Sequence, residues 1–314
     1  MEDLDALLLG EPLTLDREEV ERLAGVSTEV ALDIWTAMGF AEVPVGVKAF
    51  TSADVKALKT AVALIELGVV DMDTQLVMAR AMGQGLARLA EAQVDVLRAR
   101  TADLPPEEAL TELASRADLI LPKLDDLIVF MWRRQFAAAV QRAIATFGDH
   151  GDDGMPTLAV GFLDLVGFTR SSREWDASKL ERTLERFERD VARRVAAASG
   201  RVIKTLGDGV LYTTDSPAAA VAIALDTIAD HEADEDLPSV RAGVATGPVL
   251  FRLGDVFGET VNIASRLSSE ARPGALLVDK HTVAALGDDL EVRELQRRAV
   301  RGYRSLTPYL VRRS

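Results

Sequence analysis

A chain of 314 residues, 48% of them hydrophobic, is long enough to bury two separate cores. It contains no cysteine and three histidines, which excludes disulfides and thiolate metal sites and makes carboxylates the expected ligands of any metal. The formal net charge is −14, and the first 150 residues carry 14 basic against 25 acidic side chains, so this half of the chain would repel a phosphate backbone.

We expect neither a secretory signal nor a membrane-spanning segment. Residues 1–5 are acidic and no apolar segment follows them. No stretch of the chain approaches the roughly 20 apolar residues that a membrane-spanning helix needs. The expected protein is therefore soluble and cytoplasmic, with no transmembrane segment.

The first half of the sequence is typical of helices. Apolar residues recur at helical spacing through residues 58–97, a stretch without proline, which predicts a helix there. Pro105 predicts a break, after which residues 107–117 resume the helical pattern. A further helix is predicted after Pro122, running towards Phe147.

A polar, glycine-rich segment, residues 148–154, predicts a linker. We therefore expect two domains. Residues 1–150 form an all-helical domain that ends in a linker helix, and residues 151–314 form a second domain.

Residues 17–40 have the pattern of a helix-turn-helix, with the turn at residues 25–27. Residues 50–54 resemble the end of the winged region in MerR-type regulators, so DNA binding is one interpretation. Residues 14–59, however, carry five basic against eight acidic side chains, the wrong balance for phosphate contacts. We interpret this part as a helical scaffold with another use, and expect no nucleic-acid partner.

From Pro156 onwards, predicted strands alternate with predicted helices. One pair of strands is joined by a Gly-Asp-Gly turn, which is typical of a hairpin. Such an alternation predicts an α+β fold of ferredoxin-like topology (βαββαβ, the palm type). In chain order, the expected strands are residues 157–165, 201–213 (with the turn), 240–246 and 274–278, and the expected helices are residues 179–198, 217–231 and 259–269.

Two carboxylates are candidates for metal binding. Asp164 ends an apolar strand, where a carboxylate is costly unless it is solvated, paired or bound to a metal. Asp208 lies in the turn of the hairpin, between two glycines that let the backbone approach an ion or a phosphate. Each residue alone has an ordinary interpretation, a strand-end cap or a simple turn. Together, on neighbouring strands, they could hold a pair of Mg²⁺ ions facing a triphosphate.

Further polar residues could recognise a nucleotide. Lys204 and Asp255 offer a donor and an acceptor that complement the adenine edge. Asn262 and Arg266 are four residues apart and therefore share one helix face, from which they could orient a ribose and neutralise a phosphoryl group. Arg301 could contact terminal phosphates. Taken singly, each of these residues is also consistent with an ordinary surface position.

The order and spacing of these residues together resemble the class III nucleotidyl cyclases. Residues 162–169 (FLDLVGFT) resemble the first metal-binding motif of that family, and residues 202–209 (VIKTLGDG) resemble the second. Residues 254–266 (GDVFGETVNIASR) resemble the third motif, and residues 300–303 (VRGY) resemble the closing segment. The resemblance covers about half of the chain. The arrangement of the whole chain is similar to that of actinobacterial soluble adenylate cyclases with an N-terminal helical regulatory domain.

The resemblance implies an adenylate cyclase that converts ATP to cyclic AMP and pyrophosphate. Two Mg²⁺ or Mn²⁺ ions per active site would be held by Asp164 and Asp208. ATP would be bound by Lys204, Asp255 and Arg301, and the transition state would be stabilised by Asn262 and Arg266. The family also implies a homodimer whose catalytic domains lie head to tail and share their active sites.

Two other functions compete with this interpretation. A diguanylate cyclase would need a Gly-Gly-Asp/Glu-Glu-Phe hairpin, whereas the turn here has the sequence LGDGV. A transcription regulator that only senses nucleotide is disfavoured by the acidic first half. We expect the N-terminal domain to regulate the enzyme. Its Leu-, Met- and Ala-rich stretch at residues 58–97 could line a pocket for a lipid or another small effector, and it is also consistent with ordinary helix core or a dimer interface. His150 in the linker could titrate near neutral pH.

Overall fold

The computed structural model describes residues 2–145, 155–167, 175–296, 298–300 and 303–313. The chain forms two compact units, Met1–Val140 and Gln141–Ser314, and each is described by itself. The linker predicted at residues 148–154, with His150, lies outside the described residues, and the predicted boundary after residue 150 stays a prediction. Among the described residues, no helix has the length and apolarity that crossing a bilayer requires.

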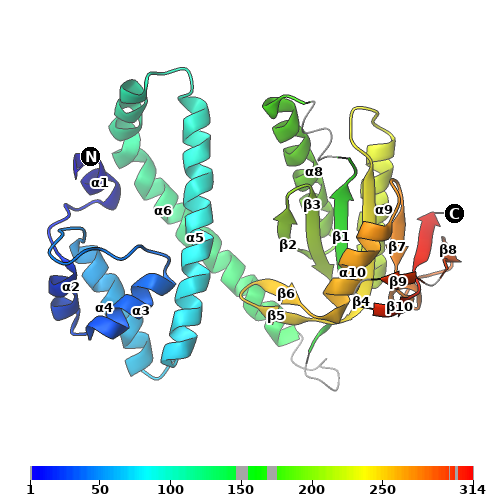
Figure 1. The fold of residues 1–314 in the computed structure, drawn as a ribbon, viewed down its shortest axis with the longest axis horizontal. Coiled ribbons are helices and arrows are strands. Elements are labelled where there is room, and N and C mark those ends of the chain that lie inside the picture. The colour runs from blue at the N-terminus through cyan, green and yellow to red at the C-terminus, as the bar shows by residue number, and fades with distance from the viewer. Residues whose placement is uncertain (1, 146–154, 168–174, 297, 301–302, 314) are drawn as a thin grey trace. The chain divides into compact units, whose positions relative to one another are not determined.

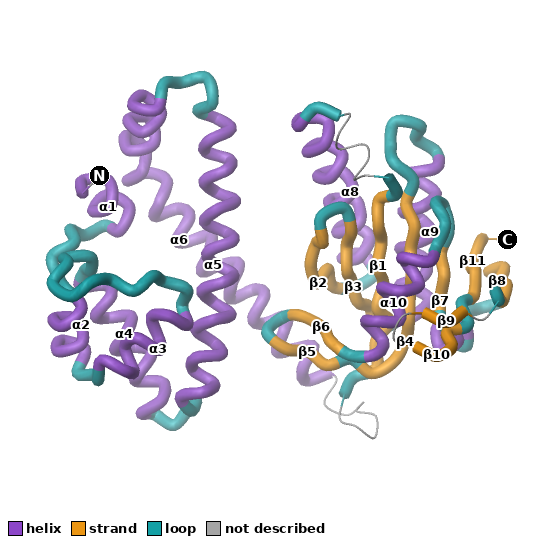
Figure 2. Tube along the Cα trace, in the orientation of Figure 1, coloured by secondary structure: helices purple, strands orange, loops and turns teal. Residues whose placement is uncertain are grey.

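The described residues of the first unit form helices joined by loops, of which the longest, residues 38–51, connects α3 to α4 (Figures 1 and 2). Leu15 and Phe50 form an isolated antiparallel β-bridge. The helices are α1 (Glu2–Leu9), α2 (Arg17–Ala24), α3 (Thr28–Ala37), α4 (Ser52–Glu66), α5 (Met72–Arg100) and α6 (Pro106–Ala145). These helices agree with the helical character predicted for this half.

The helix-turn-helix predicted at residues 17–40 is formed by α2 and α3. Asp16 and Glu19 form a capping box at the start of α2, and Gly25 ends that helix in the left-handed conformation with φ 74°. Ser27 caps α3 by accepting a hydrogen bond from the backbone of Val30. Both helices and α4 bury a small core, whose fully covered members include Val20, Ile34, Phe50 and Leu58.

Two predicted helix boundaries were wrong. The helical pattern over residues 58–97 is interrupted between α4 and α5, because Gly68 adopts φ 67° and Asp71 then caps α5 through the backbone of Thr74. Conversely, Pro122 does not separate two helices but lies inside the 40-residue helix α6. Proline removes one intrahelical hydrogen bond there, and the remaining bonds of so long a helix continue on both sides.

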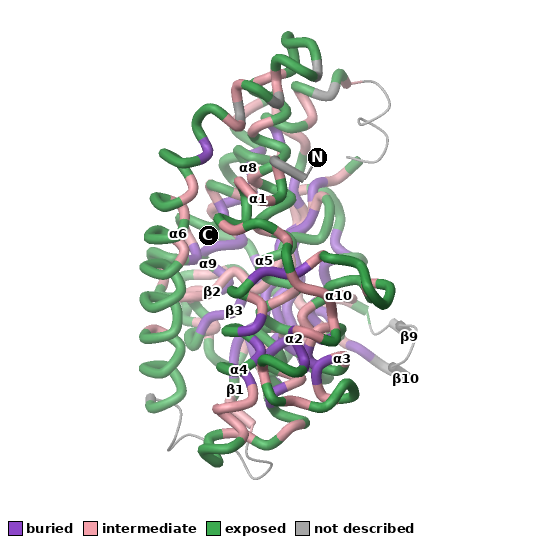
Figure 3. The backbone as a smooth tube through the Cα atoms, turned by 90° about the vertical axis from the view of Figure 1, so that its left-hand side faces the viewer, coloured by how far each residue is buried: buried purple, intermediate pink, exposed green. Residues whose placement is uncertain are grey.

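Helix α6 carries many exposed apolar side chains, and Figure 3 shows it exposed along most of its length. Trp132 and Phe136 lie one turn apart with their rings stacked, 5.7 Å between centres. Both side chains are 59% exposed. These two aromatic side chains are therefore not part of the core of the described first unit.

The second unit is an α+β fold, as predicted. A seven-stranded sheet has the order β2-β3-β1-β4-β7-β11-β8, and two further hairpins are formed by β5 with β6 and by β9 with β10 (Figure 2). All neighbours in the large sheet are antiparallel except β4 and β7. The elements are β1 (Thr157–Leu165), α8 (Ala177–Ala197), β2 (Arg201–Leu206), β3 (Gly209–Thr214), α9 (Pro217–Glu232), β4 (Val240–Pro248), β5 (Leu250–Arg252), β6 (Asp255–Phe257), α10 (Glu259–Glu270), β7 (Leu276–Val278), α11 (Lys280–Val283), β8 (Leu290–Glu294), β9 (Arg298–Val300), β10 (Tyr303–Leu306) and β11 (Tyr309–Arg313).

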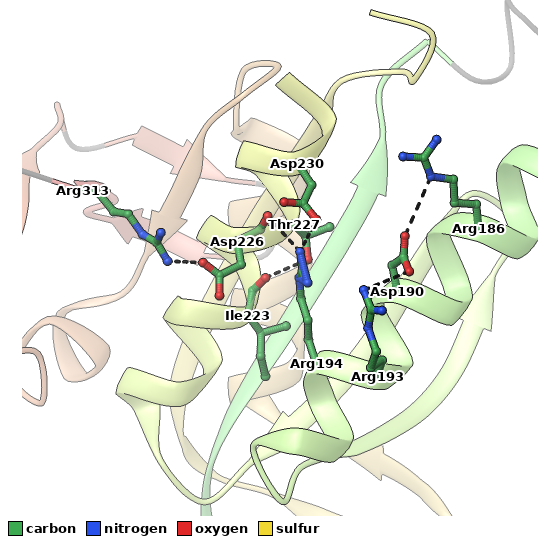
Figure 4. Close-up of polar contacts among 9 residues, drawn as sticks. All are labelled: Arg186, Asp190, Arg193, Arg194, Ile223, Asp226, Thr227, Asp230 and Arg313. Carbon is green, nitrogen blue, oxygen red and sulfur yellow. Dashed lines mark hydrogen bonds and ion pairs between the residues drawn. The ribbon is translucent and has the colours of Figure 1, made fainter. Parts of the chain in front are cut away.

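One face of the sheet is covered by α8 and α9. Alternate side chains of β1, such as Leu163 and Leu165, point into this layer and pack with Phe187 and Val191 of α8. The two helices are also joined on their outer side, where Arg194 forms an ion pair with Asp230, and Figure 4 shows this contact among its neighbours. Because such contacts are partly solvated, the apolar layer contributes most of the stability of this face.

The opposite face is covered in part, mainly by α10, with Val256 of β6 and Leu306 of β10 buried in the same core. Helix α10 packs on Val160 and Leu211 through Ala264 and Leu267. It lies very close to β4, because a Cβ atom at Gly243 would be only 2.2 Å from the backbone nitrogen of Ser268. The uncovered remainder of this face, which we call the open face, carries the candidate site.

Candidate functional site

Asp164 lies near the end of β1, in a row that crosses three strands. Its register partners are Gly209 on β3 and Arg241 on β4. The Nε atom of Arg241 donates a hydrogen bond of 2.7 Å to the Asp164 carboxylate. A second nitrogen of the same guanidinium donates to the backbone oxygen of Ser269, 3.1 Å away, in the last turn of α10. Arg241 was not predicted, because only the register of β1 and β4 brings it opposite Asp164.

Asp208 lies in the hairpin turn between β2 and β3, at the same end of the sheet as Asp164. Gly207 supplies the left-handed conformation of the turn with φ 65°, and the backbone of Leu165 donates to the Asp208 carbonyl at 3.0 Å. Burial raises the pKa of the Asp208 carboxyl above its ordinary value. The negative charge of Asp164 raises it further, while Arg241 opposes the increase.

The two carboxylates fit a site for divalent cations. Burial is the main cause of the raised pKa of Asp208, and the charge of Asp164 adds to it; a bound cation would offset both effects. Gly209 leaves space beside them, since a Cβ there would lie 3.5 Å from a carboxylate oxygen of Asp164. Among the described residues no group of three or more His, Cys, Asp or Glu side chains that could hold a metal occurs. Phe168 and Thr169 of the predicted first motif lie outside the described residues.

Lys204 and Asp255 form an ion pair between β2 and β6. Both side chains are partly exposed, at 37% and 28%. Burial acts to raise the pKa of Asp255, but the hydrogen bond and charge of Lys204, with the backbone of Val256, lower it below the ordinary value. The structure thus brings together two residues that are 51 positions apart in sequence.

Asn262 and Arg266 lie one turn apart on α10. Asn262 is exposed and Arg266 is partly buried. Within the described part of the chain, the Arg266 guanidinium makes no hydrogen bond or ion pair, so its donors are available to a ligand. Arg301, the remaining predicted residue, lies outside the described residues.

The predicted residues therefore form separate groups on the open face. Asp164 and Asp208 lie at one end of the sheet, whereas Lys204 is level with Phe162, two residues further back along β1. Among the described residues, neither Asp164 nor Asp208 forms a hydrogen bond or ion pair with Lys204, Asp255, Asn262 or Arg266. A cleft of about 880 Å³ opens at the other end of β1 and β4, beside Thr157, Pro248 and Lys280, and none of the predicted residues lines it.

Comparison with known proteins adds independent findings. The family model of the adenylate and guanylate cyclase catalytic domain matches residues 153–313. An adenylate cyclase of Streptomyces coelicolor is 43% identical over 279 residues, which cover 88% of this chain and 72% of that protein. An adenylate cyclase of Glutamicibacter nicotianae is 36% identical over 326 residues, covering 98% and 80% respectively. Among solved structures, the catalytic core of a rhodopsin-guanylyl cyclase with converted specificity, in complex with ATPαS, covers 51% of this chain and 96% of its own at 24% identity and a TM-score of 0.48.

Proposed function

Because this chain belongs to the class III nucleotide cyclases, the family of the adenylate and guanylate cyclase catalytic domain, we propose that it converts ATP to 3′,5′-cyclic AMP and pyrophosphate. We infer ATP as the substrate from the ion pair of Lys204 with Asp255 on the open face. A lysine donor beside a carboxylate acceptor complements a ring-nitrogen acceptor beside an exocyclic amine, which is the pattern of adenine. The relatives from Streptomyces coelicolor and Glutamicibacter nicotianae, which match most of the chain, are named adenylate cyclases, and this supports the same substrate.

Each of the predicted residues has a part in the proposed reaction. Lys204 donates to the adenine ring nitrogen and Asp255 accepts from the exocyclic amine, so both must exchange their mutual ion pair for the base. Asn262 orients the ribose. As the 3′-hydroxyl oxygen attacks the α-phosphorus and the bond to the bridging oxygen of pyrophosphate breaks, Arg266 neutralises the charge that grows on the phosphoryl oxygens. Arg301 would add a contact to the terminal phosphates.

Asp164 and Asp208 would hold two Mg²⁺ or Mn²⁺ ions. Such ions, when bound, make the 3′-hydroxyl more acidic and offset the charge of the triphosphate. The carboxylates contribute by fixing the point on the open face at which the triphosphate is bound. Arg241 holds Asp164 in place and must share or release it when a cation binds, because a guanidinium and a cation compete for the same carboxylate oxygen.

We further propose that the active site forms between two copies of the chain. The strands and helices β1-α8-β2-β3-α9-β4 are assigned to a ferredoxin-like βαββαβ core, and the two cores would lie head to tail. The carboxylate pair of one chain would then face the Lys204, Asp255, Asn262 and Arg266 of the other. This arrangement accounts for the separation of the two groups within one chain, since neither group alone completes a site.

The chemistry is tested by measuring cyclic nucleotide formation from ATP and from GTP with Mn²⁺, for the wild type and Asp208→Ala. Cyclic AMP made from ATP alone and lost in the variant supports the proposal. Formation of cyclic GMP at a comparable rate would refute the choice of purine. No product from either nucleotide would refute the activity of the full chain.

The shared site is tested by complementation. Asp208→Ala and Arg266→Ala chains should each be inactive, but a refolded equimolar mixture should recover about a quarter of the wild-type rate. The reason is that random pairing makes half of the dimers mixed, and each mixed dimer keeps one intact site of two. A mixture as inactive as its components would show that one chain supplies the whole site.

Regulation by the first unit is a separate proposal. It rests on α6, which runs from the first unit into residues 141–145 of the second without a break. A change in the first unit that moved this helix would alter how two catalytic units align. A chain lacking residues 1–140 should therefore show a changed specific activity at concentrations that keep it dimeric, and identical kinetics would contradict regulation. A lipid or other effector would be sought by testing which compounds change the activity of the full chain but not that of the chain lacking residues 1–140.

A further inference from the structure

A β-bulge at Ile203 decides which face of the sheet the first residues of β2 occupy. Arg201 pairs with Thr213 of β3 and Lys204 pairs with Leu211, with an irregularity between Val202 and Lys204. Residues three apart in a regular strand point to opposite faces. The extra residue of the bulge instead puts Arg201 and Lys204 on the same face, because their partners on β3 are two residues apart.

Both cations reach the same hairpin, the one formed by β5 and β6. Lys204 pairs with the carboxylate of Asp255, and Arg201 donates to the backbone oxygen of the preceding residue, Gly254, at 3.1 Å. The Arg201 guanidinium also lies over the ring of Phe251, 5.9 Å from its centre. Strand β2 therefore holds this hairpin by one contact to a side chain and one to the main chain.

The hairpin has few other attachments. Its strands have three residues each, and a two-stranded hairpin of that length is not stable by itself. Leu250, Phe251 and Leu253 are all more than 40% exposed, while Val256 on β6 is buried in the core beneath α10. The turn between the strands is formed by Leu253 and Gly254, which both have positive φ (53° and 81°). The position of Asp255 thus depends on the buried Val256 on one side and on the held Gly254 on the other.

We propose that Arg201 is a positioning residue for purine recognition, which fixes Asp255 through the carbonyl of Gly254 so that Asp255 can accept from the exocyclic amine of adenine. The inference rests on the proposed function and deepens it. The peptide between Gly254 and Asp255 is planar, so a fixed carbonyl also fixes the nitrogen and Cα of Asp255. Lys204 cannot supply this constraint with ATP bound, because Lys204 and Asp255 then turn to the base. The contact of Arg201 is made to the main chain and persists.

The test uses the full chain with three variants. Arg201→Met removes the donors and keeps the apolar stem, and Arg201→Lys keeps the charge and a donor. Arg252→Gln is the matched control, since Arg252 is an exposed arginine of the same hairpin that makes no hydrogen bond or ion pair with the described residues. The probes are ATP for turnover, and 3′-deoxy-ATP and 3′-deoxy-GTP, which lack the attacking hydroxyl, for equilibrium binding with Mn²⁺.

Arg201→Met should raise the KM for ATP and the Kd of 3′-deoxy-ATP about tenfold, the effect of one hydrogen bond from a charged donor. The kcat should stay within about twofold of the wild type, because the lost constraint acts on base recognition. Binding of 3′-deoxy-GTP should not weaken, so selectivity for adenine falls. Arg201→Lys should recover most of the loss, and Arg252→Gln should match the wild type.

Several results would overturn the proposal: an unchanged KM in Arg201→Met, an equal weakening of both deoxynucleotides, or the same loss in Arg252→Gln. The binding measurement separates this inference from the proposed function. A wild-type chain that makes no cyclic AMP yet prefers 3′-deoxy-ATP, and loses that preference in Arg201→Met, would refute the activity and support the role of Arg201. If the wild-type chain makes cyclic AMP and Arg201→Met keeps the same selectivity for 3′-deoxy-ATP over 3′-deoxy-GTP, the proposed activity is supported and the role of Arg201 is refuted.

Discussion

Replacing Gly243 with alanine should push α10 away from the sheet. The added Cβ would lie 2.2 Å from the backbone nitrogen of Ser268 and 2.3 Å from the backbone oxygen of Ala264, whereas ordinary contacts begin at 3.4 Å. All the nearest atoms belong to the helix backbone, so no side chain can rotate out of the way. Relief requires the helix or the strand to shift by about 1 Å, the difference between these distances.

The shift should lower activity more than stability. Overpacking of this kind costs about 1–3 kcal/mol, which corresponds to about 2–4 °C in Tm for each kcal/mol in a unit of this size. Asn262 and Arg266 move with α10, and a displacement of about 1 Å in groups that position a reacting phosphate can reduce kcat about 100-fold. We expect a folded chain with a lowered Tm and a kcat reduced by about two orders of magnitude.

The assay combines calorimetric unfolding with kcat for cyclic AMP formation. Gly85→Ala is the control, because Gly85 lies inside α5 and a Cβ added there would have no atom within 4 Å, so alanine should leave kcat unchanged and stabilise the helix by about 1 kcal/mol. A Gly243→Ala chain with lowered Tm but wild-type kcat would show that the placement of α10 does not control the chemistry. Unchanged Tm and kcat together would refute the close packing itself.

Three further outcomes can be measured. Tyr212→Phe should lower the free energy of unfolding by about 1–2 kcal/mol in chemical denaturation, because the fully buried hydroxyl donates to the Ala220 carbonyl at 2.7 Å, and an equal Tm would argue against that bond. Asp208→Asn should abolish metal-dependent activity yet keep or raise the metal-free Tm, since burial raises the pKa of this carboxyl and so disfavours its charged form; a large loss of Tm would contradict this. Burial lowers the pKa of His231, so its stabilising contribution is present above the ordinary value near 6.5 and is lost as the pH falls below it. His231→Asn should therefore flatten this slope of stability against pH, and an unchanged slope would contradict the role of His231.

Long periodic segments were predictable from the sequence. The apolar run of β1, the amphipathic pattern of α8 and the Gly-Asp-Gly turn between β2 and β3 each appear close to where the pattern placed them. The short strands β5, β6 and β8 to β11 were not predicted, because segments of three to five residues are too brief to show alternation. Their pairing is decided by the tertiary structure, as when β11 inserts between β7 and β8.

The sequence singled out individual candidate residues but not their geometry. Resemblance to a family identified Lys204 and Asp255, and the structure places them in contact. Their proposed roles, like those of Asn262 and Arg266, stay predictions. Arg201 and Arg241 were missed because each owes its position to a feature that sequence patterns do not contain, the bulge at Ile203 and the register of β1 with β4.

Arg241 connects two parts of the second unit that would serve different active sites. It contacts the carboxylate of Asp164 and the last turn of α10, the helix that carries Asn262 and Arg266. In the proposed head-to-tail dimer, Asp164 would act in one site and α10 in the other. A cation that draws Asp164 away from Arg241 in the first site therefore frees one of the constraints on the helix of the second. The two sites of a dimer built in this way are energetically coupled, and the dependence of rate on metal concentration should be cooperative.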